Sequence, residues 1–203
     1  MPKLDLKKKE KEFYYPSTSE VSVVDLPEMK FLMIDGHGDP NTSQEYQDAM
    51  ETLFPVSYKT KFTSKKEKSK DYVVMPLEGL WWADNMEEFS IADKSSWKWT
   101  VMIRQPDFIN ETLINKAIKE LEKKKDLPSL SKLRFETFKE EKTVQIMHLG
   151  PYGEAEAPAV NKLHEYIEKE GYQLRGKHHE IYISDMRRTK PEKLRTVIRQ
   201  SFE

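Results

Sequence analysis

One segment near the C-terminal end of the chain carries the residue types from which acid–base chemistry is built. If residues 178–184 form a strand, alternation places His178, Glu180 and Tyr182 on one face and His179 on the other. A carboxylate beside aromatic rings can bind a cationic or hydrogen-bonding ligand, and burial can raise its pKa until it works as a general acid or base. We expect this face to point away from the packed helix into a cleft; a solvent-facing polar strand is the alternative that the pattern leaves open.

A second segment offers the same combination in the first half of the chain. In residues 77–82, Glu78 and Trp82 share one face of a strand, and Trp81 lies on the other. Each half therefore has a carboxylate and a ring on the face that we expect to lie opposite its helix. If these faces line one cleft, Glu78 and Glu180 converge on a single pocket.

Other catalytic templates are absent from the sequence. The chain has no cysteine, which excludes thiol catalysis, thiolate metal sites and disulfides. It has neither the G-x-S-x-G pattern of a serine hydrolase nor the H-E-x-x-H pattern of a zinc protease, and its five histidines lack zinc-ligand spacing. The Gly36-His37-Gly38 turn lacks the pattern of a phosphate-binding loop. We therefore expect no metal and no cofactor.

The elements that must position these residues follow an order that occurs twice. Hydrophobic periodicity and turn signals predict them. In the first half they are a strand at 29–35, a turn at 35–40, a helix, and strands at 72–82 and 97–105 joined by a loop at 83–96. The N-cap of this helix is Asn41, Thr42 or Ser43, and residues 59–70 are its solvated Lys-rich end and the loop that follows. In the second half they are a strand at 143–149, a turn at 150–153, a helix ended by Gly171, and strands at 178–184 and 195–202. A helix capped by Asn110 and a strand at 133–139 precede these repeated elements.

This repeated order indicates a duplicated module. The strings at 100–105 and 196–200 are nearly the same, and five elements recur in the same order around them. We predict an α+β fold of duplicated strand–helix–strand–strand modules that form antiparallel sheets, with a ligand cleft at their pseudo-two-fold axis. Module one spans about 21–107 and module two about 108–203.

The first 20 residues are expected to be a charged leader. They contain a run of lysines and glutamates and show no apolar period. Phe13, Tyr14 and Tyr15 dock this leader on the domain, or else it is mobile.

Composition narrows the class of partner. Lys plus Arg is 34 and Asp plus Glu is 35, and this balance argues against a dedicated nucleic-acid binder. No apolar run approaches the ~18 residues of a membrane helix, and the charged N-terminus does not look like a signal peptide. We expect a cytoplasmic monomer or homodimer whose partner is a small aromatic molecule rather than nucleic acid or a membrane.

Five motifs together resemble the GyrI-like small-molecule-binding family, over about residues 20–202. They are Met33–Asn41, Met75–Trp82, Trp97–Pro106, Gln145–Tyr152 and Gly176–Tyr182. The resemblance implies two strand–helix–strand–strand modules around a cleft in which a glutamate, matched here by Glu180, meets lipophilic and often cationic ligands. The Pro-Leu-Glu-Gly-Leu-Trp-Trp segment resembles a stand-alone branch, the cyclopropanoid cyclopropyl hydrolases, which open the cyclopropane of yatakemycin-type DNA alkylators.

The chemistry of the substrate that the resemblance implies suggests roles for the candidate residues. Glu180 would orient or deprotonate the attacking water, and Tyr152 or a histidine would donate to the developing phenolate. The candidate ligand-binding residues are Glu78, Trp81, Trp82, Trp99, His148, His178 and Tyr182. We place a detoxifying hydrolase ahead of a drug-sequestering protein without turnover; a gyrase inhibitor is the third alternative, and no segment marks the surface that it would need.

Overall fold

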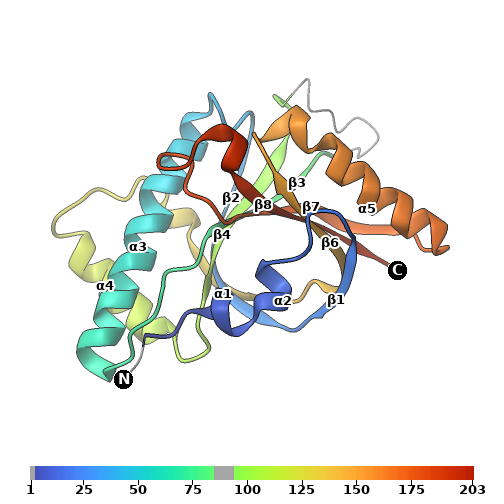
Figure 1. The fold of residues 1–203 in the computed structure, drawn as a ribbon. Helices are drawn as coiled ribbons and strands as arrows, with labels where there is room; N and C mark the ends of the chain where they lie inside the picture. Colours follow the sequence, from blue (N-terminus) through green and yellow to red (C-terminus); the bar gives the residue numbers. More distant parts are fainter. Residues whose placement is uncertain (1–2, 85–93) are drawn as a thin grey trace.

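The computed structural model describes residues 3–84 and 94–203. Within these ranges, eight antiparallel strands form one sheet in the order β1-β6-β8-β7-β3-β4-β2-β5 (Figure 1). The strands are β1 (Ser22–Leu26), β2 (Met29–His37), β3 (Leu77–Trp82), β4 (Lys98–Gln105), β5 (Arg134–Phe138), β6 (Glu141–Leu149), β7 (Leu174–Tyr182) and β8 (Arg195–Phe202). The helices are α1 (Leu6–Lys9), α2 (Lys11–Tyr14), α3 (Gln44–Lys68), α4 (Glu111–Leu121) and α5 (Ala157–Lys169), with 3₁₀ turns η2 (Leu130–Lys132), η3 (Gly153–Glu156) and η4 (Pro191–Lys193). The fold is thus α+β, as predicted.

The centre of the sheet is the pair formed by β3 and β7. Strands β4 and β2 follow β3 on one side, and β8 and β6 follow β7 on the other. Both halves of the sheet therefore have the same strand order. The register places Glu180 opposite Gly79 and His178 opposite Trp81. Residues from the two halves of the sequence therefore meet at the middle of the sheet.

Helices α3 and α5 lie on the same face of this sheet. Leu163 of α5 packs with Ile198 of β8, and the ring of Tyr46 on α3 stacks on Trp81 of β3. Directly opposed residues of neighbouring antiparallel strands share a face. Because Glu180 opposes Ile198 in the ladder, its side chain lies on this helix-bearing face.

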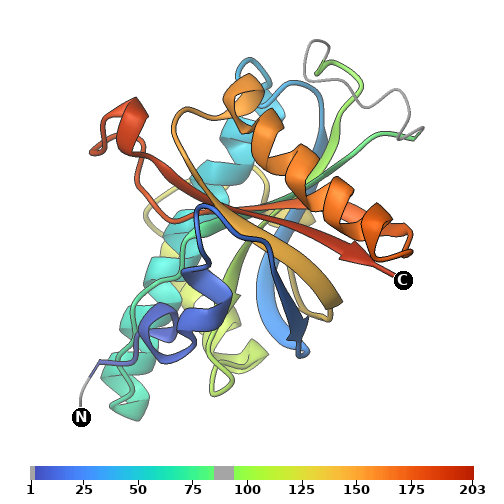
Figure 2. The same cartoon turned by 45° about the vertical axis from the view of Figure 1, so that its right-hand side comes forward.

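The expectation that Glu180 points away from the helices is therefore wrong. Strand alternation grouped His178, Glu180 and Tyr182 correctly, but it does not tell which face a helix covers. Helix α3 packs over β2 and β4, and α5 packs over β6 and β8, so the central strands β3 and β7 lie between the two helices (Figures 1 and 2).

The start of the chain packs on the opposite face. The hydroxyl of Tyr14, a residue only 1% exposed, accepts a hydrogen bond from Arg104 at 2.8 Å. The carbonyl of Phe13 accepts from Arg199 at 2.5 Å. Of the two alternatives for the charged leader, the structure shows the docked one; Tyr14 is buried, whereas Tyr15 is 41% exposed.

Helix α3 begins at one of the three predicted caps and ends within the predicted Lys-rich segment, part of which is buried rather than solvated. The hydroxyl of Ser43 accepts from the backbone N–H of Tyr46 at 3.3 Å, which caps the helix. The helix ends only at Lys68, and its lysine-rich end pairs with acidic residues, for example Lys61 with Asp71 at 3.0 Å. Among the described residues, no helix is both long and apolar enough to cross a membrane.

Strand boundaries differ from the predictions where local chemistry intervenes. Strand β3 begins at Leu77 because Pro76 has no N–H for the ladder. Strand β7 begins earlier than predicted, at Leu174, and has an irregular register near Gly176, whose φ of 71° suits glycine. Strand β1 was not predicted. Most of the loop predicted at 83–96 lies outside the described residues.

Candidate functional site

The carboxylate of Glu180 is held by two neighbours on its own strand. The hydroxyl of Tyr182 donates to Oε2 at 2.7 Å, and Nε2 of His178 lies 2.9 Å from Oε1. The side chains of His178 and Glu180 are 11% and 13% exposed. These three residues are the ones that strand alternation groups on one face, so the sequence predicted their proximity.

Glu180 is an ionised carboxylate at neutral pH. Burial alone would raise its pKa, but the hydrogen bonds from His178 and Tyr182 and the charge of Lys94 hold the pKa below its usual value. The Tyr182 hydroxyl keeps its proton, because burial and the charge of Glu180 raise its pKa well above the usual value. The site therefore contains a negative charge with fixed donors around it.

Aromatic rings from three elements gather on the same face. We call Tyr46 of α3, Trp81 of β3, Trp97 directly before β4, and Trp99 of β4 the ring cluster. Tyr46 stacks on Trp81 at 6.2 Å between centroids and meets Trp99 edge-on at 5.2 Å, and Trp81 lies 5.6 Å from Trp97. The Trp81 ring lies against Gly79, the ladder partner of Glu180, so the ring cluster adjoins the carboxylate. Burial raises the pKa of Tyr46, and the charge of Glu180 raises it further.

The Trp81 indole has its position because residue 79 is a glycine. A Cβ on Gly79 would stand 2.6 Å from Nε1 of Trp81, so any other residue would displace the ring. Gly79 is the ladder partner of Glu180. The Nε1–H of Trp81 is buried and has no hydrogen-bond partner in the described structure, which leaves a donor free for a ligand.

Tyr152 joins the site from the turn before α5. Its ring meets that of Tyr182 edge-on, with 5.2 Å between centroids. Burial and the charges of Glu156 and Glu180 raise the pKa of Tyr152 to about 12, so its hydroxyl is a donor at neutral pH. His148 contacts this turn, because its Nε2 lies 3.0 Å from the carbonyl oxygen of Pro151. It therefore supports the turn rather than the ring cluster.

Sequence reasoning missed Glu156, at the end of η3. This side chain is 3% exposed, and its Oε2 accepts from the backbone N–H of Gly153 at 2.6 Å. Burial and the charge of Glu180 raise the pKa of Glu156 to about 8. The available signal was a glutamate directly before a helix whose second residue is Pro158, a pattern that indicates only a helix start.

Two more titratable residues missed by sequence reasoning flank the site. The ammonium of Lys94 lies 5.1 Å from the ring centroid of Trp97, and its charge lowers the pKa of both Glu156 and Glu180. Burial and the charge of His178 lower the pKa of His164 on α5. No motif marked either residue, because Lys94 belongs to a predicted loop and His164 to a helix.

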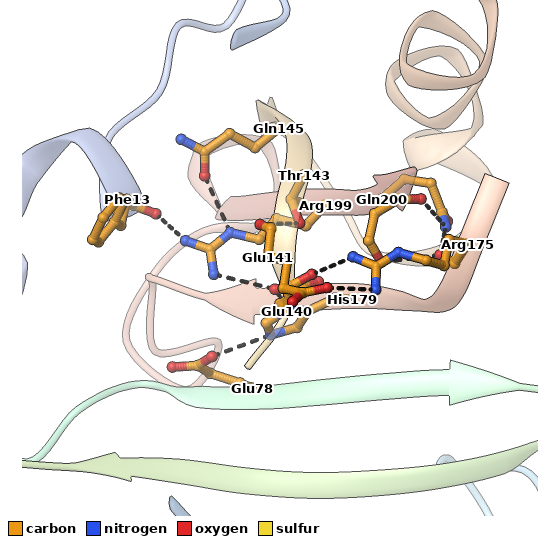
Figure 3. A network of polar contacts seen from close by, with 11 residues as sticks. Phe13, Glu78, Glu140, Glu141, Thr143, Gln145, Arg175, His179, Arg199 and Gln200 are labelled. Atoms are coloured by element: carbon orange, nitrogen blue, oxygen red, sulfur yellow. Dashed lines mark hydrogen bonds and ion pairs between the residues drawn. The ribbon is translucent and has the colours of Figure 1, made fainter. Parts of the chain in front are cut away.

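Glu78 and Trp82 do not lie with Glu180, which corrects the prediction that two glutamates converge. Glu78 is 1% exposed on the opposite face, where its Oε2 lies 3.1 Å from Nε2 of His179 (Figure 3). Trp82 shares that face and lies under the ammonium of Lys177 at 3.2 Å. A shift of one residue in the pairing of two strands moves a side chain to the other face, and the apparent match of Glu78 with Glu180 was such a shift.

The face opposite Glu180 holds a buried charged network instead. Figure 3 shows His179 between Glu78 and Glu140, with Arg199 beside Glu140. Gln145 also accepts a hydrogen bond from Arg199, at 3.1 Å. In the described part of the chain, no group of three or more His, Cys, Asp or Glu side chains is arranged to hold a metal ion. On the helix-bearing face, the arrangement offers one ionised carboxylate, one carboxyl that keeps its proton, and flat rings.

Comparison with protein families gives one match. A family model described as "GyrI-like small molecule binding domain" matches residues 19–199. No significant match was found among curated proteins.

Comparison with solved structures gives full-length matches at high identity. The chain is similar to an uncharacterized conserved protein from Listeria innocua, with 40% identity, a TM-score of 0.91, and coverage of 99% of this chain and 100% of that chain. It is also similar to a hydrolase encoded by lin2189 from Listeria innocua, with 39% identity, a TM-score of 0.88 and full coverage of both chains. The C-terminal domain of EcmrR shares the fold, with 15% identity, a TM-score of 0.56, and coverage of 91% of this chain and 97% of that chain.

Proposed function

The chain belongs to the GyrI-like small-molecule-binding family, and from this premise we propose that it binds flat, largely apolar aromatic molecules beside Glu180 and hydrolyses a strained ring in them. The substrate class is the cyclopropane-bearing DNA alkylators of the yatakemycin type, and the physiological role is detoxification. The similarity to a hydrolase from Listeria innocua supports an enzyme over a passive binder.

One observation carries this proposal. Glu180 is ionised, nearly buried and fixed by His178 and Tyr182, and it adjoins the ring cluster. Flat rings favour a planar apolar ligand through stacking and burial of apolar surface. An oriented carboxylate supplies the base that a hydrolysis needs.

The reaction follows from the electronic structure of such a substrate. Its cyclopropane is conjugated to a dienone, so water can attack the ring CH₂ carbon while the C–C bond breaks. The electron pair of that bond moves into the ring system and makes the carbonyl oxygen a phenolate. Glu180 accepts the proton of the attacking water, and the rings hold the substrate in the attacking geometry.

A second candidate function is binding without turnover. Both oxygens of Glu180 already have side-chain partners, Tyr182 and His178. A carboxylate that is fully hydrogen-bonded serves as well to attract a ligand's donor group as to deprotonate water. In that case the protein sequesters its ligand and releases it unchanged.

Incubation with a panel of cyclopropane alkylators separates these two functions. We expect mass spectrometry to show a product heavier by one water, formed in amounts far above the amount of protein. Stoichiometric retention of unchanged alkylator contradicts the hydrolase and supports sequestration. If the protein neither hydrolyses nor retains any alkylator, both proposed functions are wrong.

A further inference from the structure

Two carboxyl groups on the helix-bearing face, Glu156 and Glu180, have unlike surroundings. Glu156 bonds to the turn that contains Tyr152, and the ring of Tyr152 meets that of Tyr182, whose hydroxyl donates to Glu180. Glu180 receives hydrogen bonds on both oxygens. Glu156 receives only one, from the N–H of Gly153, and its Oε1 is buried with no hydrogen-bond partner in the described structure. The hydroxyl of Thr196 lies close enough to the Glu156 carboxyl to lower its pKa, although neither Oγ1 of Thr196 nor Oε1 of Glu156 has a partner at full hydrogen-bond geometry.

Capping of the turn accounts for only one of the two carboxyl oxygens of Glu156. A glutamate that reaches back to an N–H at a helix start is a common capping device. Capping by Glu156 uses Oε2 alone. An ionised Oε1 buried without a donor is costly, whereas a protonated Oε1 carries a hydrogen that it can donate.

We propose that Glu156 is the acid of this site and donates its proton from Oε1 to the carbonyl oxygen of the bound ligand, an inference that rests on the hydrolase function proposed above. Glu180 and Glu156 then form a base and acid pair. The ligand class is narrowed to planar aromatic compounds with a ring carbonyl. Sequence motifs on β7 mark the base but not the acid, which comes from the turn before α5.

The proton and electron balance of the step closes. Water forms a C–O bond to the cyclopropane CH₂ and gives one proton to Glu180. The broken C–C bond supplies the electron pair that makes the ring carbonyl oxygen negative, and Glu156 gives that oxygen its proton. Glu156 ends ionised and Glu180 protonated, and one proton transfer between them through solvent restores the starting state.

The electrostatics of the site agree with this division. Burial is the largest cause that raises the pKa of Glu156, followed by the charge of Glu180, and together they outweigh the Gly153 N–H, the Thr196 hydroxyl and the charge of Lys94, which lower it. The phenols that face the pair, Tyr152 and Tyr182, have raised pKa values and stay neutral. Two carboxyl groups whose environments separate their pKa values are the usual signature of an acid and a base in one site.

The first test uses Glu156→Gln. Glutamine keeps an oxygen for Gly153 and an amide that can donate to the ligand, but it cannot transfer a proton. We expect kcat for alkylator hydrolysis to fall by about 10²- to 10⁴-fold with KM nearly unchanged. The wild-type rate should fall above pH 8, and the variant should lack that alkaline limb.

The matched control is Glu154→Gln, in the same turn but exposed. It should keep the wild-type rate and pH profile. Wild-type kcat in Glu156→Gln, or an alkaline limb that persists in it, overturns the proposal and leaves Glu156 as a cap.

The second test does not depend on turnover. It compares 9-fluorenone with fluorene, a flat pair that differs in one carbonyl, by quenching of tryptophan fluorescence. Below pH 8 the wild type should bind the ketone about threefold to tenfold more tightly than the hydrocarbon, which is the usual value of one hydrogen bond. Above pH 8 this preference should disappear, whereas Glu156→Gln should keep it at every pH because an amide does not ionise.

The two tests separate failure of the acid from failure of the hydrolase. If no alkylator is hydrolysed but the ketone preference follows the ionisation of Glu156, the hydrolase is wrong and Glu156 remains the donor of a binding site. A ketone preference that is absent, or is independent of pH in the wild type, overturns the proposal for Glu156. A carbon-13 titration of the Glu156 carboxyl with a midpoint below pH 6 also overturns the proposal for Glu156.

Discussion

Glu180 is the residue on which the proposed chemistry depends. Glu180→Gln keeps the size of the side chain and an oxygen for the Tyr182 hydroxyl, but it removes the charge and the base. We expect turnover to fall by about 10²- to 10⁴-fold while the protein stays folded. Steady-state kinetics and thermal unfolding measure the two effects separately.

The neighbouring residue provides the control for Glu180. Ile181 is fully buried on the opposite face of β7, so Ile181→Ala should lower the free energy of unfolding by about 2–5 kcal/mol through a cavity. If Glu180→Gln is fully active, Glu180 is not the base. If Glu180→Gln fails to fold, Glu180 is a structural carboxylate.

Lys94 is expected to set the charge preference of the site. Its ammonium already lies over Trp97 in the field of both glutamates, where a cationic ligand would bind. Lys94→Met should therefore bind tetraphenylphosphonium more tightly than the wild type does, by about tenfold, as measured by tryptophan fluorescence.

Lys98→Met is the control for that change, because Lys98 pairs with Asp84 on the other face of the sheet. It should leave phosphonium binding unchanged. Equal affinities of wild type and Lys94→Met for this cation contradict the role of Lys94.

At the scale of elements, strand β7 serves two purposes on its two faces. Glu180 and His178 belong to the candidate site, while His179 between them enters the buried network with Glu78 and Glu140. Burial alone would lower the pKa of His179, but the charges and hydrogen bonds of the two glutamates raise it to about 9.

This shift predicts a pH dependence of stability. An unfolded histidine titrates near pH 6.5. Protonation of His179 therefore stabilises the fold fully below about pH 6.5, and this contribution is lost as the pH rises through 9. Denaturant unfolding of the wild type should show the free energy of unfolding falling over that interval, by at most about 3 kcal/mol.

His179→Gln should make that pH profile flatter than the wild-type one. His37→Gln is the control, since the His37 side chain is 78% exposed, and it should keep the wild-type slope. Equal slopes in His179→Gln and the wild type mean that His179 does not gain its proton on folding.

The docked N-terminal helices predict a contrast between two adjacent tyrosines. Tyr14 is 1% exposed and bonded to Arg104, so Tyr14→Ala should lower the free energy of unfolding by about 3–5 kcal/mol. Tyr15 is 41% exposed, and Tyr15→Ala should change the free energy of unfolding by less than about 0.5 kcal/mol. Denaturant unfolding of both variants measures the difference, and equal effects contradict the docking.

For the whole molecule, the equal strand order of the two halves predicts that residues 29–105 and 144–201 superpose. In such a superposition the strands that contain Arg104 and Arg199 should coincide. A crystal structure measures this directly, and unrelated positions for these two strands contradict a duplication. The same superposition would match Leu77, not Glu78, with Glu180, because Leu77 opposes Ile103 and Glu180 opposes Ile198.

Much of the fold was predictable from the sequence because it follows from local patterns. The N-cap at Asn110, the end of α5 at Gly171 and strand β8 are where the sequence places them, and the cap of α3, Ser43, is one of the three candidates. These features depend on backbone hydrogen bonding and on side-chain alternation within a few residues. Strand β1 was missed because its pattern is short and half exposed.

The sequence by itself determined the composition of the β7 trio, since alternation puts His178, Glu180 and Tyr182 on one face of any strand. Only the tertiary structure decided that this face carries the helices, that Glu78 lies on the other face, and that the turn with Tyr152 and Glu156 packs against Tyr182 beside Glu180. The physical reason is that strand register and helix placement are set by contacts between residues about 100 positions apart, as in the pairing of β3 with β7. A shift of one residue in such a pairing exchanges the two faces, and no local pattern records it.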